Sequence, residues 1–406
     1  MSQIFQLSAL RKNFKRFLAT LFFIVIPRFR PRIKDPVVGI NLIGYSRGDL
    51  GLGESLRYIS RALKKIGLPF IVRSFQVNLK TSQNNLSLEG FEASFCQYPI
   101  NLITINPDMI YQIPLKIRYT EWARRYNIAN WFWELENFPQ EWRYSIPLID
   151  EVWVNTEFLA HAMRQAHPKV IKIPFAVEFE MPSVHFTKRY FNLPENSFIF
   201  LCTFDFQSSL ARKNPCASIE AFLAAFSPQD HNIFLVIKSI NAHLHSSMLH
   251  QLKLLAKNDP RVLFMDRQLS STEMHGLLHI ADCYISLHRS EGVGLGMAES
   301  MFLGKPVIAT AYSGTLEFMN YQNSYLIPYE KIAVAEGEYP HAKNQVWANP
   351  SIKDAAEAMQ KIFSNFEFRF NLGKNAREYM LEHHSFSVMG AAIKNRLEEI
   401  KVLTLQ

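Results

Sequence analysis

A regular alternation of short apolar runs with amphipathic stretches extends along most of the chain. The first apolar run, residues 37–43, is followed by a glycine-rich turn and by a helical pattern that stops at Gly67. Further apolar runs follow at residues 70–72, 102–105, 129–132, 152–155 and 170–173. Short buried strands that alternate with helices are typical of a doubly wound parallel sheet. The pattern therefore predicts an α/β fold.

The same alternation starts again after Pro194, which indicates a second sheet. Its apolar runs lie at residues 198–203, 233–237, 262–264, 283–286 and 307–309. A chain of 406 residues is also too long for one compact core. Two Rossmann-like parallel-sheet domains would face each other across a cleft, because ligands of such sheets bind at the carboxyl ends of the strands. We expect four parts: an N-terminal arm at residues 1–35, a first domain at 36–180, a second domain at 190–385 and a C-terminal helix at 386–406 that crosses back to the first domain.

The N-terminal arm carries the whole charge excess of the chain. Lys and Arg number 44 and Asp and Glu 36, and the excess of 8 equals the 8 basic residues of positions 1–34, where no acidic residue occurs. The arm's apolar residues recur at helical spacing, but its apolar run, residues 17–26, is shorter than the roughly 20 residues that cross a bilayer. We therefore expect residues 1–34 to lie on an anionic membrane surface, with packing against the body as the alternative. The formally neutral remainder argues against nucleic acid as a partner.

The cysteines bear on the compartment. Cys96, Cys202, Cys216 and Cys283 are scattered without C-x-x-C spacing, which argues against a disulfide framework or a zinc site. Such usage favours a reducing compartment. Together with the basic arm, it predicts a cytoplasmic protein that is peripheral on the inner face of the plasma membrane.

The most specific chemical signal lies directly after the apolar run at residues 283–287. Two glutamates, Glu291 and Glu299, are separated by seven residues that include a glycine-rich turn. Such a turn lets backbone N–H groups approach a phosphate, and a helix that begins near Leu295 would direct its positive N-terminus toward it. Carboxylates suit the hydroxyls of a sugar and of a ribose. The segment is therefore predicted to bind a sugar nucleotide, the donor of a sugar transfer. Its predicted donor-binding residues are Glu291, Gly292, Val293, Gly294, Leu295 and Glu299.

This segment resembles the signature of the retaining glycosyltransferases of family four, which have the GT-B fold. Glu291 and Glu299 match the two glutamates of that signature, and residues 304–310 continue the match. The resemblance implies that Glu291 holds the donor sugar and Glu299 the ribose of a nucleotide-diphosphate sugar. It also implies transfer of a hexose with retention, without a metal or another cofactor.

Other segments are similar to bacterial polysaccharide mannosyltransferases. The similarity covers residues 131–136 and 150–154. It implies a glycan or lipid-linked acceptor and a role in the biosynthesis of cell-surface polysaccharide such as lipopolysaccharide.

Three basic residues are candidates for binding the diphosphate. Arg212 and Lys213 follow the apolar run at residues 198–203 and precede a helix, where adjacent cations suit a diphosphate. Members of the family usually place an arginine and a lysine several residues apart; Lys213 matches the lysine, whereas Ser208 stands near the arginine position, so Arg212 would take over that task. Lys238, at the end of the run 233–237, is a third candidate, with a solvated strand end as the alternative.

Two segments of the first domain complete the predicted site. Gly51 and Gly53 lie in the turn after the first strand, and the resemblance implies that this turn closes over the donor phosphates. Trp133 and Glu134 place an aromatic ring beside a carboxylate, a pair that suits a carbohydrate acceptor. Packing of the aromatic side chain in the core is the alternative.

Two other functions remain open. A non-catalytic protein that binds a sugar nucleotide or acts as a membrane scaffold could use the same fold. An NAD-dependent oxidoreductase would need a G-x-G-x-x-G turn and an acidic residue after the second strand. The turn at residues 48–53 has a different glycine spacing, and the second run is followed by the basic Arg73.

Overall fold

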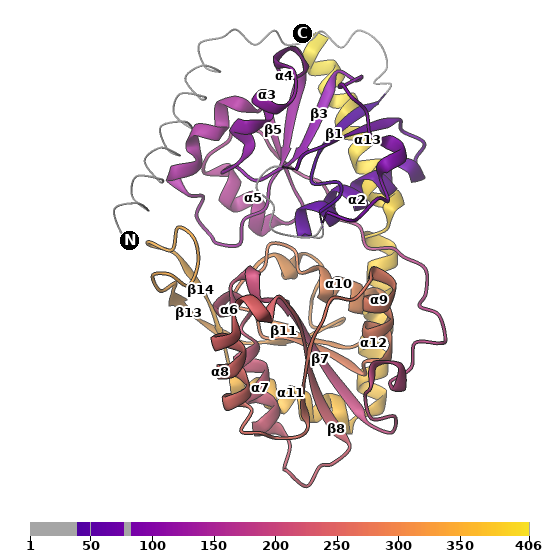
Figure 1. The fold of residues 1–406 in the computed structure, drawn as a ribbon, viewed down its shortest axis with the longest axis vertical. Helices are drawn as coiled ribbons and strands as arrows, with labels where there is room; N and C mark the ends of the chain where they lie inside the picture. The colour runs from indigo at the N-terminus through magenta and orange to yellow at the C-terminus, as the bar shows by residue number, and fades with distance from the viewer. Residues whose placement is uncertain (1–38, 49, 77–82, 406) are drawn as a thin grey trace. The chain divides into compact units, whose positions relative to one another are not determined.

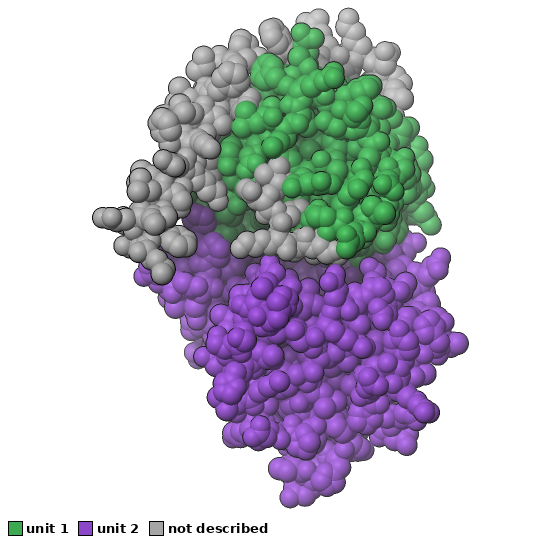
Figure 2. Space-filling model, viewed as in Figure 1, with its two compact units in different colours: residues 1–133, 137–176, 386–406 green, residues 134–136, 177–385 purple. Residues whose placement is uncertain are grey.

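The computed structural model describes residues 39–48, 50–76 and 83–405, which form two compact units. Unit 1 contains the described residues up to Trp133, residues 137–176 and the chain from Phe386 onward; unit 2 contains residues 134–136 and 177–385 (Figure 2). Each unit is built on a six-stranded parallel sheet, which confirms the predicted fold class. The expected membrane contact of residues 1–34 lies outside the described residues. Within the described chain, no helix has the length and apolar character needed to span a membrane.

The sheet of unit 1 has the strand order β2-β1-β3-β4-β5-β6 (Figure 1). Its strands are β1 (Ile40–Gly44), β2 (Phe70–Ser74), β3 (Ile100–Thr104), β4 (Tyr126–Asn130), β5 (Glu151–Val154) and β6 (Val170–Lys172). Its helices are α2 (Gly51–Lys65), α3 (Ile113–Lys116), α4 (Tyr119–Ala123), α5 (Glu157–Arg164) and α13 (Phe386–Leu405). The chain leaves β1 toward β2 on one side, and β3 lies on the other, so the switch point of this sheet lies between β1 and β3.

The last helix belongs to unit 1. α13 packs on α2, where a Cβ on Gly390 would lie 2.6 Å from the Ile66 side chain. Arg396 of α13 donates through Nε to the fully buried carboxylate of Glu151 over 2.9 Å. A buried carboxylate needs such a partner, so this ion pair ties the C-terminal helix to β5.

The sheet of unit 2 has the order β12-β11-β10-β7-β8-β9, which places its switch point between β7 and β10. Its strands are β7 (Phe198–Asp205), β8 (Ile233–Ile240), β9 (Val262–Asp266), β10 (Cys283–Ser286), β11 (Val307–Thr310) and β12 (Tyr325–Ile327), and β13 (Tyr329–Ala333) and β14 (Val346–Pro350) form an antiparallel hairpin. Its helices are α6 (Leu210–Lys213), α7 (Pro215–Ala225), α8 (Ser246–Leu255), α9 (Ser271–Ile280), α10 (Leu295–Phe302), α11 (Ile352–Ser364) and α12 (Phe366–His383).

Burial on both faces explains why the strands read as unbroken apolar runs. In unit 2, α7, α8 and α11 cover one face of the sheet, and α9, α10 and α12 lie on the other (Figure 1). Phe200 of β7 and Phe222 of α7 are fully buried in the core that the sheet forms with α7 and α11. A parallel sheet covered on both faces has no polar side to expose, so its strands do not alternate.

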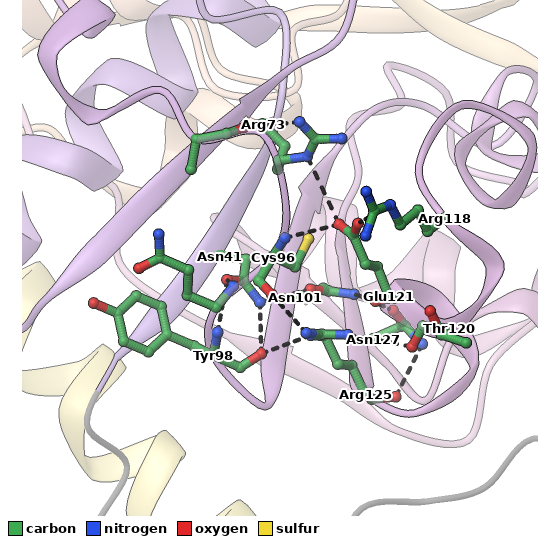
Figure 3. A network of polar contacts seen from close by, with 12 residues as sticks. Asn41, Arg73, Cys96, Tyr98, Asn101, Arg118, Thr120, Glu121, Arg125 and Asn127 are labelled. Atoms are coloured by element: carbon green, nitrogen blue, oxygen red, sulfur yellow. Dashed lines mark hydrogen bonds and ion pairs between the residues drawn. The ribbon is translucent and has the colours of Figure 1, made fainter.

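A buried ladder of amide side chains joins the three central strands of unit 1. Asn41, Asn101 and Asn127 occupy paired positions on β1, β3 and β4 and are fully buried. Asn41 Nδ2 donates to Asn101 Oδ1 over 2.9 Å, and Asn101 Nδ2 donates to Asn127 Oδ1 over 2.8 Å (Figure 3). A strand shifted by one residue would leave these amides buried without partners, so the ladder favours a single register.

Ionic groups extend the ladder into the loops around it. Glu121 accepts from the backbone N–H of Cys96 over 2.7 Å, and Arg125 donates to the carbonyl oxygens of Cys96 and Tyr98 (Figure 3). The ladder asparagines stand second in their strands, at the amino ends. The network therefore lies away from the carboxyl edge where parallel sheets bind ligands, and we assign it a structural role.

We expect Asn101→Leu to destabilise unit 1 by about 2–4 kcal/mol, because it removes the central amide and leaves buried polar groups unpaired. Hydrogen exchange of the β3 amides measures this loss locally. The exposed Asn84→Ala is the control and should change exchange little. Equal protection of β3 in wild type and Asn101→Leu would show that the ladder does not stabilise the sheet.

Candidate active site

The predicted donor segment lies at the switch point of the unit 2 sheet. β7 and β10 are paired neighbours. The chain continues from β7 through a 3-10 turn, η5 (Phe206–Ser208), into α6, and from β10 through residues 287–294 into α10. Because both connections leave the carboxyl edge of the sheet at its switch point, they meet where ligands of this sheet type bind.

Glu291 forms ion pairs with both cations that end α6. Its Oε2 lies 3.0 Å from Arg212 Nη1, and its Oε1 accepts from Lys213 Nζ over 2.5 Å. Glu291 is 6% and Arg212 5% exposed, so little solvent separates these charges. Burial raises the pKa of Glu291, but the positive charges of Arg212 and Lys213 outweigh it and lower the pKa to about 2. The structure thus brings together three residues that the sequence predicts to act together.

The guanidinium of Arg212 is held on several sides. Nη1 donates to the Ser290 carbonyl over 2.9 Å, and Nη2 donates to the Ser208 carbonyl over 3.3 Å. The Tyr339 ring lies 5.8 Å from the guanidinium carbon, within the range of a cation–π contact. Arg212 Nε has no hydrogen-bond partner among the described residues, so one buried donor remains available.

Two residues with left-handed backbone frame α6. Ser209 has φ 63°, and its hydroxyl accepts from the Arg212 N–H and donates to the Glu338 carbonyl. Asn214 has φ 51°, and its amide donates to the Leu287 carbonyl over 2.9 Å. Non-glycine residues in this region need such support. These bonds fix the single turn of α6 against the connection that follows β10.

The glycine turn before α10 is clamped from the connection after β11. Gly294 has φ 91° and precedes α10 without a side-chain cap, so the first N–H groups of the helix keep their positive end. Ser313 accepts from the Glu291 N–H over 2.8 Å, and the Gly314 N–H donates to the Glu291 carbonyl over 2.9 Å. A Cβ on Gly314 would lie 1.9 Å from the Gly292 carbonyl oxygen, so only glycine fits. Sequence reasoning missed Ser313 and Gly314, although their place just after the β11 run was a usable signal.

Glu299 lies apart from the ion-paired cluster. It is in α10, and its Oε1 lies 4.0 Å from Nε2 of His275 in α9. Phe179 stacks on the His275 ring at 3.6 Å. The two predicted glutamates therefore stand in different surroundings: Glu291 lies in the turn before α10, and Glu299 lies inside the helix.

Lys238 is neither a solvated strand end nor a partner of Glu291. β8 continues to Ile240 because it pairs with β7 along its whole length, so Lys238 lies inside the strand and not at its end. It is 5% exposed, and its Nζ donates to the Ser239 carbonyl over 2.9 Å. Burial lowers the pKa of Lys238 to about 8, against the opposing attraction of Asp266. Among the contacts of the described residues, none joins this lysine to the cluster around Glu291.

We expect Lys238→Met to stabilise unit 2 at pH 7, and this gain to shrink as the pH rises from 8 to 10.5. Between the folded pKa of about 8 and the ordinary value of 10.5, the unfolded chain binds more protons, so wild-type stability rises with pH. The buried charge costs up to about 3 kcal/mol below this window. Urea unfolding at pH 7 and pH 10 measures the difference, with the exposed Lys353→Met as control. A gain independent of pH would contradict the assignment.

The predicted acceptor pair is divided between the two units. Trp133 is 2% exposed in unit 1, where its indole packs edge-on against Trp142 at 4.8 Å and donates to the Asn137 carbonyl. It presents no ring face for a sugar, which matches the core-packing alternative. Glu134, counted in unit 2, accepts from the hydroxyl of Tyr339 over 2.5 Å. Tyr339 comes from the β13–β14 hairpin, which sequence reasoning did not connect with the site.

The two predicted glycines of unit 1 lie in the first turn of α2 and not in a loop, because that helix begins at Gly51. A Cβ on Gly53 would lie 2.4 Å from the Gly48 carbonyl oxygen, so close packing explains this glycine. A Cβ on Gly51 would meet no described atom within 4 Å, so packing does not explain this one. Among the side chains that the structure describes, no group of three or more His, Cys, Asp or Glu is arranged to hold a metal ion.

Known proteins resemble this chain both in the sequence around the site and in the overall fold. Residues 192–379 match the family model described as "Glycosyl transferases group 1". No curated protein matches the sequence significantly. HepE (Alr3699) from Anabaena, solved in complex with UDP and glucose, has a TM-score of 0.63 at 15% identity, over 89% of this chain and 100% of that one.

Two further solved structures are similar over nearly the whole chain. A sucrose-phosphate synthase from Thermosynechococcus elongatus has a TM-score of 0.63 at 15% identity, over 90% of this chain and 100% of that one. A glycosyltransferase from Rickettsia africae has a TM-score of 0.61 at 15% identity, over 91% and 99%. The chain thus has the GT-B fold, and most of its second unit matches the group 1 glycosyltransferases.

Proposed function

We propose that the protein is a retaining glycosyltransferase, which moves a hexose from a nucleotide-diphosphate sugar to a glycan or lipid-linked acceptor. The observation that carries this proposal is the buried cluster of Glu291, Arg212 and Lys213 at the switch point of unit 2. The cluster lies beside the N-terminus of α10, within the residues that match the group 1 family. A carboxylate for sugar hydroxyls and cations for a leaving phosphate are the two groups that this chemistry requires.

The proposed roles follow from charge and hydrogen-bonding capacity. Arg212, Lys213 and the first N–H groups of α10 neutralise the departing diphosphate, so protein groups supply the positive charge. Glu291 accepts from hydroxyls of the donor sugar, and Glu299 accepts from the ribose. The backbone of Gly292, Val293, Gly294 and Leu295 approaches the phosphates closely, which the left-handed Gly294 permits.

The proposed reaction retains the configuration at the anomeric carbon. The bond from that carbon to the phosphate oxygen breaks, and a bond to the acceptor oxygen forms on the same face. The acceptor's proton passes to the departing phosphate oxygen, so no side chain is needed as a general base. Glu134 is proposed to bind acceptor hydroxyls, and Gly51, which no packing contact explains, to allow close approach of the donor phosphates.

The proposed setting is cell-surface polysaccharide assembly at the inner face of the plasma membrane, with residues 1–34 as the membrane contact. The neighbours suggest where a donor search should begin. HepE was solved with UDP-glucose, and TarM from Staphylococcus aureus, with a TM-score of 0.54 at 16% identity over 73% of this chain and 55% of that one, was solved with UDP. UDP-sugars are therefore the first donors to test, followed by GDP-, ADP- and TDP-sugars.

A thermal-shift screen with the four nucleoside diphosphates should identify the base, after which product formation can be followed with the matching sugar donors. Glu291→Gln and Arg212→Met should each lower turnover by about 100-fold or more, because each removes a charged contact to the donor. The exposed Glu220→Gln in α7 is the matched charge control and should keep wild-type turnover. Unchanged turnover of Glu291→Gln would refute the site. Nucleotide binding without product from any acceptor would favour a non-catalytic protein.

A further inference from the structure

We propose that Glu291 competes with the donor diphosphate for Lys213, so that binding of the donor exchanges an internal ion pair for a phosphate contact. This inference rests on the proposed function and concerns how the donor enters and how the product leaves. Arg212 and Lys213 have two roles that conflict: binding the diphosphate and pairing with Glu291. The cations assigned to the diphosphate are the same two groups that the Glu291 carboxylate already contacts, at 3.0 and 2.5 Å.

The conflict is electrostatic. A diphosphate seated on both cations would lie within a few ångströms of the Glu291 carboxylate, and like charges in a buried site repel each other strongly. Glu291 is 6% exposed, so water cannot screen this repulsion well. One of the anions must therefore give up its contact with the cations.

The geometry indicates which groups move. Arg212 is held by the Ser290 and Ser208 carbonyls and by the Tyr339 ring, so its guanidinium stays in place when Glu291 withdraws. The side chain of Lys213 is 23% exposed, and Glu291 is the only hydrogen-bond partner of its Nζ among the described residues. Lys213 is thus the cation that can change partners.

The backbone of Glu291 does not take part in the exchange. Ser313 and Gly314 bind its N–H and its carbonyl oxygen, so only the carboxylate can turn away. A carboxylate released inside a buried site needs new hydrogen-bond donors. The hydroxyls of the donor sugar supply them, so the intact donor satisfies both the cations and Glu291.

A diphosphate without a sugar satisfies only the cations. After transfer, the product nucleotide leaves Glu291 buried without donors, and the carboxylate recovers Lys213 as the diphosphate departs. The exchange therefore favours the intact donor over the product, and it makes Glu291 a determinant of product release as well as a contact of the sugar.

Inorganic pyrophosphate tests the exchange without knowledge of the base, and calorimetry measures its affinity. Glu291→Gln should bind pyrophosphate at least about tenfold more tightly than wild type, because the competing charge is gone while the cations remain. Glu136→Gln removes the same charge from a carboxylate that pairs with Lys331 and Tyr312, so it should change the affinity less than about twofold. Adding Lys213→Met to Glu291→Gln should abolish the gain. If Glu291→Gln does not fold, Glu291→Ala, which also removes the carboxylate, should still bind more tightly than wild type.

The possible results of these binding measurements distinguish failure of the ion-pair exchange from failure of the proposed glycosyltransferase function. Equal or weaker pyrophosphate binding by Glu291→Gln, while the wild-type protein still forms product from a sugar donor, would overturn the exchange and leave the glycosyltransferase proposal standing. An equal gain in Glu136→Gln would also overturn it, because general charge would then explain the effect. If neither wild type nor Glu291→Gln binds pyrophosphate or any of the four nucleoside diphosphates, both proposals fail.

Discussion

The buried contact of one carboxylate with two cations organises the carboxyl edge of the unit 2 sheet. Charges that are nearly excluded from water need each other, and Glu291, Arg212 and Lys213 meet only because three separate connections converge. The one-turn helix after β7, the glycine turn after β10 and the clamp after β11 are each held by hydrogen bonds to another of the three. These connections contain residues with left-handed backbone, Ser209, Asn214, Gly294 and Ser313, at the edge of the sheet where the positive charges gather.

Unit 1 contains a buried ladder of polar side chains, which are neutral amides. Its central strands are joined by neutral amides near their amino ends, where Asn41, Asn101 and Asn127 fix the register. Neutral groups do not carry the desolvation cost of charges, so they suit a permanent core. At the carboxyl edge of its sheet, by contrast, unit 2 brings buried charged side chains together.

Much of the fold could be predicted from the sequence, because strands buried on both faces must be apolar runs. The grouping of Glu291, Arg212 and Lys213 was also predictable, since they lie in the connections that follow two neighbouring strands, β10 and β7. Lys238 was misplaced because strand length is set by pairing with β7 and not by where an apolar run ends. The burial of Trp133 and the part played by Tyr339 depend on packing between distant segments, which no local pattern records.

These three charged residues are proposed to bind a nucleotide-diphosphate sugar together. A crystal structure of the protein with the donor found by the nucleotide screen would show where that sugar nucleotide lies. We expect the diphosphate within hydrogen-bond distance of Lys213 and Arg212, beside the first turn of α10, with the Glu291 carboxylate turned to the hydroxyls of the sugar. A donor bound elsewhere in unit 2, with Glu291 still paired to Lys213, would show that these residues do not form the donor site.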